Sequence, residues 1–161
     1  MDFHERLERA IQRGERTGEK QRQADATQAL SKEEFKRLHS KYRLELSEHI
    51  EACVAQLPNH LPGFQFETVV SDRGWGAAAS RDDIGRGGAG RRDNFYSRLE
   101  MVVRPLGKYH VLDLAAKGAV RNKEIFNRNH FQQLDEIDLE SFRELIDLWV
   151  LEYAELYAAK N

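Results

Sequence analysis

The chain has 161 residues, of which 40% are hydrophobic and 32% are charged. A chain of this length buries about two-thirds of its surface on folding, so one domain can form a core without a disulfide or a metal. No apolar run approaches the roughly 20 residues that a membrane helix needs, which excludes a membrane-spanning protein. Cys53 is the only cysteine and Met1 is not followed by an apolar leader, so we expect a cytoplasmic protein.

Charge is distributed unevenly along the chain, although the formal net charge is only -2. Residues 35–133 contain 16 basic and 11 acidic side chains, whereas residues 134–161 contain 2 basic and 8 acidic ones. The pI near 6.3 argues against a dedicated nucleic-acid-binding domain, because basic charge normally dominates such a module. A local basic patch is still compatible with this distribution.

The first thirty residues are predicted to form a helical arm or a flexible extension. Asp2 and Glu5 indicate a helix start, and Phe3, Leu7 and Ile11 follow at helical spacing. Residues 14–27 contain no large apolar side chain, so they cannot contribute to a core. We therefore divide the chain into an arm at residues 1–30 and a single α+β domain at residues 31–161.

A long amphipathic helix is predicted over residues 32–57. Ser31 and Glu34 have the spacing of a capping box, in which each side chain bonds the backbone of the other residue. Apolar side chains then recur every three or four positions, at Phe35, Leu38, Tyr42, Leu46, Ile50, Cys53 and Leu57. Pro58 is expected to end the helix.

The spacing of the cysteine and the histidines along the chain does not suggest a metal site or a catalytic group. Cys53 lies on the apolar stripe of the predicted helix, where it is interpreted as a small core side chain. His39 and His49 are ten residues apart, which is not a metal-ligand spacing within one helix, and His130 has no neighbouring ligand pattern. We therefore predict no metal and no cofactor.

The middle of the chain is predicted to form four or five strands joined as successive hairpins. Alternating apolar residues and turn chemistry place strands at residues 64–70, 75–79, 95–103 and 109–116, with further strand character near residues 125–126. The connections are predicted as a tight hairpin at Pro105–Lys108, a bulge or turn at Lys117–Gly118 and a turn at Asn122–Lys123.

The last helix has the strongest pattern. Asp138 can cap its start, and apolar residues follow at Phe142, Leu145, Ile146, Trp149, Val150, Tyr153, Leu156 and Tyr157. The fold class is therefore α+β: a mainly antiparallel sheet packed on one face by the long helix and the C-terminal helix. Leu148 and Leu151 add apolar surface outside the main stripe, which could serve a homo-oligomer contact.

A glycine-rich segment carries the only ligand motif. Residues 85–90 read G-x-G-x-x-G, but the preceding residues are too polar for a buried strand and no βαβ pattern surrounds them, so we do not expect a dinucleotide site. A different interpretation is a phosphate clamp, since guanidinium groups fork onto phosphates and glycines let the backbone approach. Its candidate ligand-binding residues are Arg81, Arg86, Arg91, Arg92, Gly88 and Gly90.

The leading hypothesis is a non-catalytic protein-interaction or adaptor module whose partner, another protein, binds the open sheet face or the 80–94 loop. The first alternative is binding of a phosphate ligand or single-stranded nucleic acid through residues 81–92. The second alternative is an enzyme with a site assembled across the open face, although the chain contains no G-x-S-x-G, P-loop or H-E-x-x-H motif.

Overall fold

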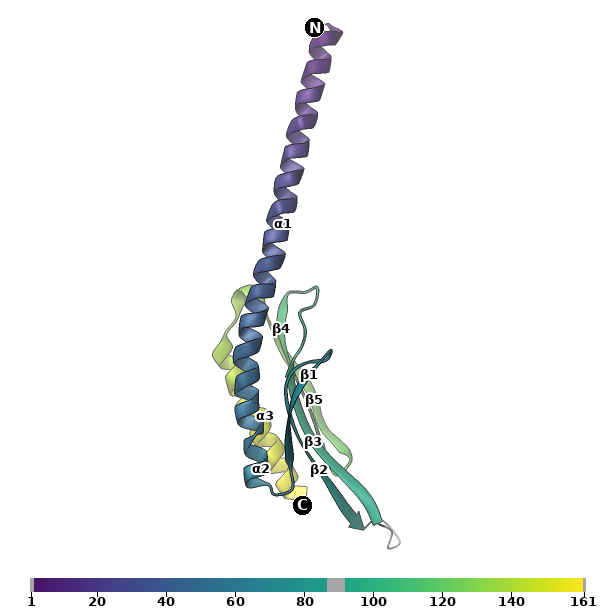
Figure 1. Cartoon of the computed structure of the whole chain (residues 1–161), viewed down its shortest axis with the longest axis vertical. Helices are drawn as coiled ribbons and strands as arrows, with labels where there is room; N and C mark the ends of the chain where they lie inside the picture. Colours follow the sequence, from purple (N-terminus) through teal and green to yellow (C-terminus); the bar gives the residue numbers. More distant parts are fainter. Residues whose placement is uncertain (1, 87–91, 161) are drawn as a thin grey trace. The chain divides into compact units, whose positions relative to one another are not determined.

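The computed structural model describes residues 2–86 and 92–160, apart from the side chains of residues 27–30, 84–86, 92 and 93 (Figure 1). The chain divides into two units, one reaching to Arg37 and the other starting at Leu38. The described residues of the first unit are helical from Phe3 onward, and the second unit contains the sheet and the remaining helical residues.

Helix α1 runs without interruption over Phe3–Val54, so the predicted helix start at Lys32 is wrong. Glu, Lys, Arg, Gln and Ala are good helix formers, and no proline occurs before Pro58. Pairs such as Gln21 and Asp25, bonded at 3.0 Å, support the exposed helix, while each internal glycine costs only about 1 kcal/mol relative to alanine. A polar segment without a core-facing stripe can therefore remain helical.

The end of α1 also differs from the prediction. The helix stops at Val54, and a separate short helix α2 covers Gln56–His60. Pro58 lies within the first turn of α2, where a backbone N–H would have no partner inside the helix, so proline is tolerated there.

The predicted antiparallel sheet is confirmed, with five strands in the order β1-β2-β3-β4-β5. The strands are β1 (Gln65–Ser71), β2 (Gly74–Arg86), β3 (Arg92–Val103), β4 (Val111–Val120) and β5 (Lys123–Gln133). Each strand pairs antiparallel with the next, so the sheet is a simple meander of hairpins. This architecture contains none of the parallel strands that a dinucleotide site requires, within the part of the chain that the structure describes.

The β2–β3 hairpin is longer than the sequence predicts. Its pairing continues through Ser80 and Asp82 to the pair formed by Arg86 and Arg92, although this segment was expected to be a loop. Strand pairing satisfies the backbone of polar residues as well as that of apolar ones, so polar composition did not prevent a strand here.

Three connections decide the register of the later strands. The predicted tight hairpin at Pro105–Lys108 is wrong, because the chain from Arg104 to His110 forms a wider loop between β3 and β4. The predicted bulge is confirmed, with a register shift between Gly118 and Ala119. The β4–β5 turn lies at Arg121 and Asn122, one residue earlier than predicted, and both have the positive φ of a type I′ hairpin turn.

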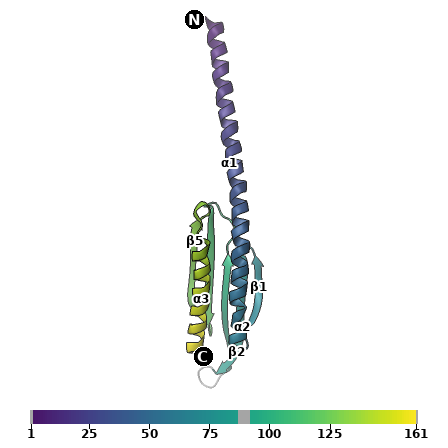
Figure 2. The same cartoon turned by 90° about the vertical axis from the view of Figure 1, so that its left-hand side faces the viewer.

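Both helical layers of the second unit cover the same face of the sheet (Figures 1 and 2). Helix α3 spans Leu139–Lys160, and the Asp138 carboxylate accepts from the Ser141 amide at 3.4 Å, as the predicted cap requires. The buried side chains of α3 are Phe142, Ile146, Trp149, Val150, Tyr153 and Tyr157, all of them on the predicted stripe. Leu148 and Leu151 are exposed, as their position off the stripe suggested.

Alternation along β3 separates the two faces of the sheet. Leu99, Met101 and Val103 are fully buried on the helix-covered face, and the residues between them point to the other face. Among the described residues, the polar side chains of His39 and Ser97 are also buried. The Nε2 atom of His39, on α1, lies 3.0 Å from the carbonyl oxygen of Arg104. Burial lowers the pKa of His39, so the core holds a neutral imidazole.

Candidate functional site

A small apolar cluster lies on the sheet face that the helices leave open. Val69, Ala78 and Val102 are buried, and Ala115 packs against them. The register explains the grouping, because Gly76 stands between Val69 and Val102 in one row across the strands, and Ala115 is the next member of that row. Because glycine and alanine have little or no side chain, the surface here lies close to the backbone, and the long side chains beside it can cover it.

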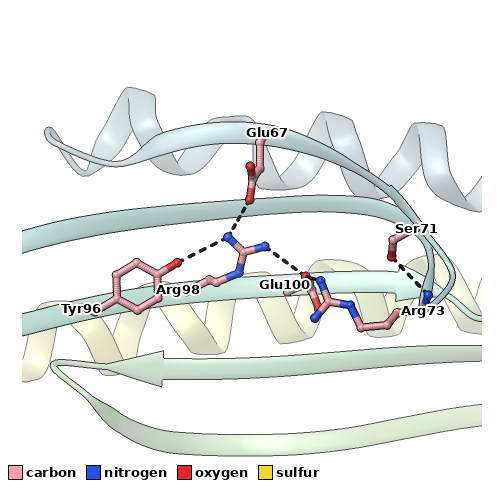
Figure 3. A network of polar contacts seen from close by, with 6 residues as sticks. All are labelled: Glu67, Ser71, Arg73, Tyr96, Arg98 and Glu100. Carbon is pink, nitrogen blue, oxygen red and sulfur yellow. Dashed lines mark hydrogen bonds and ion pairs between the residues drawn. The ribbon is translucent and has the colours of Figure 1, made fainter.

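A network of ion pairs borders this cluster (Figure 3). The Arg98 guanidinium donates to Glu67 at 2.6 Å and to Glu100 at 3.0 Å, and Arg73 also donates to Glu100, at 3.2 Å. The hydroxyl oxygen of Tyr96 lies 3.5 Å from Arg98. On the open face, side chains therefore link β1 and the β1–β2 turn to β3, across the intervening strand β2.

The same network keeps Arg98, its central residue, positively charged. Burial lowers the pKa of Arg98, but hydrogen bonds to Glu67, Glu100 and Tyr96 outweigh it, so the pKa is raised overall. Glu100 is 13% exposed on its side chain and accepts from two guanidinium groups, so little of its charge faces solvent. The charges of Glu67, Arg98 and Glu100 are therefore paired with one another rather than free.

A groove of about 550 Å³ lies beside the network, where the β1–β2 turn meets β3, β4 and β5. Its lining residues are Asp72, Arg73, Glu100, Val102, Arg104, Pro105, Ala115, Ala116, Lys117 and Asn127. The volume falls within the range of about 300–1,000 Å³ that ligand sites occupy. Val102 and Ala115 provide an apolar floor, and the charged side chains stand around it.

Exposed cations dominate the rim of this groove, which we call the open-face groove. The side chains of Arg73, Arg104 and Lys117 are 67%, 53% and 65% exposed. Arg104 lies 3.8 Å from Asp113, and Lys117 lies 3.9 Å from Glu124, distances too long for direct hydrogen bonds. Both cations therefore have donors left for a ligand.

Of the predicted ligand-binding residues, the structure describes Arg81 in full and the backbone of Arg86 and Arg92. Arg81 donates to Asp83 at 2.7 Å and to the carbonyl oxygen of Pro62 at 2.6 Å, so its guanidinium is engaged within its own chain. Arg86 and Arg92 form the last strand pair of the β2–β3 hairpin. Gly88, Gly90 and Arg91 lie outside the described residues. Ligand binding through residues 81–92 stays a prediction.

A second polar cluster joins the helices α1 and α3. The Nε2 atom of His49 lies 2.8 Å from Oδ1 of Asp147, and the Cys53 thiol donates to the same oxygen at 3.2 Å. Burial raises the pKa of Cys53 to about 12, with the Asp147 carboxylate adding to the effect. The thiol is therefore protonated near neutrality, which does not suit a catalytic nucleophile.

This cluster corrects one interpretation from the sequence. Cys53 is only partly buried and contacts polar groups, so it is not a purely apolar core residue. The sequence did contain a signal, since His49 and Cys53 are four residues apart on a helix and so share one face. Asp147 could not be connected with them, because it lies 94 residues after Cys53.

Comparisons with known proteins do not identify a relative. No protein-family model matches the chain, and neither curated proteins nor solved structures give a match. Among the described residues, no helix combines the length and the apolar character needed to cross a membrane.

Proposed function

We propose that the chain is a non-catalytic protein-interaction module that binds an acidic segment of a partner protein in the open-face groove. The observation that carries this proposal is the charge of the groove rim. Arg73, Arg104 and Lys117 are exposed, whereas Glu100 is largely shielded and Asp72 is the one exposed acid among the lining residues.

The floor of the groove supports a peptide rather than a purely ionic contact. Val102 and Ala115 offer apolar surface at the centre, and charge surrounds it, which is the arrangement of an interface core with a polar rim. A peptide segment of the partner with one apolar side chain between acidic ones fits this arrangement. Its apolar side chain would be buried on the floor of the groove, and its acidic side chains would pair with Arg104 and Lys117. The hydrogen-bonded network around Arg98 holds the neighbouring side chains in place before binding, so binding does not have to order them.

The proposal can be tested by selecting random displayed peptides on the full chain. We expect enrichment of Asp and Glu around an apolar residue. The affinity of a selected, fluorescently labelled peptide should fall about tenfold for each lost charge-assisted contact in the double variant Arg104→Gln and Lys117→Gln. The matched control, Lys20→Gln with Lys123→Gln, removes the same charge from exposed positions outside the groove and should leave the affinity nearly unchanged.

Two results would contradict the proposal. Selected peptides without acidic residues would show that rim charge does not choose the ligand. Equal losses in the groove and control variants would show a nonspecific effect of net charge. Salt-sensitive binding of a single-stranded oligonucleotide that survives the groove variant would instead favour the site predicted at residues 81–92.

A further inference from the structure

Three metal-ligating side chains converge between two helices. His49 and Cys53 stand one turn apart on α1, and Asp147 reaches them from α3. One potential ligand atom from each residue lies within 4.8 Å of the other two. The cluster is separate from the open-face groove, because α1 and α3 cover the opposite face of the sheet (Figure 2).

The orientation of the imidazole distinguishes this cluster from a catalytic relay. In a relay of nucleophile, histidine and carboxylate, the two partners use different ring nitrogens. Here the same nitrogen, Nε2 of His49, lies 2.8 Å from Asp147 Oδ1 and 3.6 Å from Cys53 Sγ. The three atoms therefore surround one point instead of forming a chain.

Their separations approach those of a tetrahedral zinc site. Bond lengths of about 2.3 Å to sulfur and about 2.05 Å to nitrogen or oxygen place the ligand atoms about 3.6 Å (sulfur to nitrogen or oxygen) and about 3.4 Å (nitrogen to oxygen) apart. The sulfur–nitrogen distance is already 3.6 Å, the sulfur–oxygen distance is 3.2 Å and the nitrogen–oxygen distance is 2.8 Å. A movement of about half an ångström by the carboxylate of Asp147, which lies on the exposed side, would bring the other two separations to these values.

The helices hold these positions through their packing. Ile50 and Val54 are fully buried beside the two α1 ligands, and Ile146 is fully buried next to Asp147. A second cross-link joins the same helices, with Arg143 of α3 lying 3.9 Å from Glu45 of α1. Ligands on packed helices are positioned more precisely than ligands on loops.

We propose that His49, Cys53 and Asp147 bind one Zn²⁺ ion, with a water molecule at the fourth position. Thiolate, imidazole and carboxylate together suit zinc, whereas Ca²⁺ and Mg²⁺ prefer oxygen ligands only. Binding replaces the thiol proton of Cys53, which passes to solvent, and the ion then neutralises the thiolate and the carboxylate. The site would tie α1 to α3 on the helix-covered side of the sheet.

The full chain, freed of metal with a chelator, can be titrated with Co²⁺ as a spectroscopic substitute for Zn²⁺. Because Cys53 is the only cysteine, a sulfur-to-cobalt charge-transfer band reports on this site alone. We expect the band, with visible absorption of tetrahedral intensity, to saturate at one ion per chain and to disappear on adding Zn²⁺.

Variants then separate the site from adventitious binding. Loss of a residue that only hydrogen-bonds a metal ligand typically lowers metal affinity about 10–100-fold, so His49→Gln and Asp147→Asn should each lower Zn²⁺ affinity at least as much. The control His60→Gln changes an exposed histidine and should have no effect. Circular dichroism confirms that each variant is folded. Absence of the charge-transfer band, or Zn²⁺ affinity that survives both ligand variants, would overturn the proposal.

Discussion

Replacing Trp149 with alanine tests the packing of α3 most simply. The indole is 5% exposed, and its ring centroid lies 5.8 Å from the Arg128 guanidinium. A buried aromatic side chain covers about 150–250 Å², and at about 25 cal/mol per Å² this burial contributes several kcal/mol. Truncation also leaves a cavity, so we expect a loss of about 3–5 kcal/mol in the free energy of unfolding.

Urea unfolding followed by circular dichroism measures this loss without relying on tryptophan fluorescence, which the substitution itself changes. At about 2–4 °C per kcal/mol, the melting temperature should fall by roughly 6–20 °C. Leu151→Ala on the same helix is the matched control, because Leu151 is 67% exposed and should change stability by less than about 0.5 kcal/mol. Similar small losses for both variants would refute the assignment of the buried face of α3.

Three further predictions concern the second unit. Gly76→Ala should unfold the sheet or lower the free energy of unfolding by more than about 4 kcal/mol in a denaturant titration, because the Cβ of the alanine would stand 1.9 Å from the Met101 carbonyl oxygen. Unfolding of this variant at the same denaturant concentration as the unaltered chain would contradict the prediction. Tyr153→Phe should cost about 0.5–1.5 kcal/mol by removing a 2.8 Å hydrogen bond to a β4 carbonyl, whereas the exposed Tyr109→Phe should cost almost nothing. The free energy of unfolding should fall as pH drops below the unfolded-state pKa of His39, about 6.5, because His39 binds a proton more readily in the unfolded chain than in the folded one. In the variant His39→Gln, the free energy of unfolding should depend less steeply on pH. Equal slopes for the two proteins would refute this prediction.

The sequence predicts the sheet and α3 well because both carry a periodic apolar pattern, with a period of two residues in the strands and of three to four residues in the helix. In α3, every buried side chain belongs to the predicted stripe, and Asp138 caps the helix as expected. In the sheet, the bulge at Gly118 and the turn near Asn122 appear almost where their residue types place them. These features depend on local chemistry and on which face is buried, both of which can be inferred from one sequence.

The two longest misassigned segments lie where no apolar pattern is available. Residues 14–27 have no buried face, so hydrophobic periodicity could not predict that α1 continues through them, although their helix propensities favour it. The polar ends of β2 and β3 were assigned to a loop for the same reason. The groove and the His49, Cys53 and Asp147 cluster assemble residues from distant strands and helices, which spacing along the chain cannot predict.

An NMR titration of the isotope-labelled chain with a selected acidic peptide tests directly whether the open-face groove binds the partner. We expect the largest amide shifts at Arg73, Val102, Ala115 and Lys117, around the open-face groove. Residues of α3 on the opposite face should change little. Shifts concentrated on α3, or on the β2–β3 hairpin near Arg81, would contradict the assignment of the groove as the binding site.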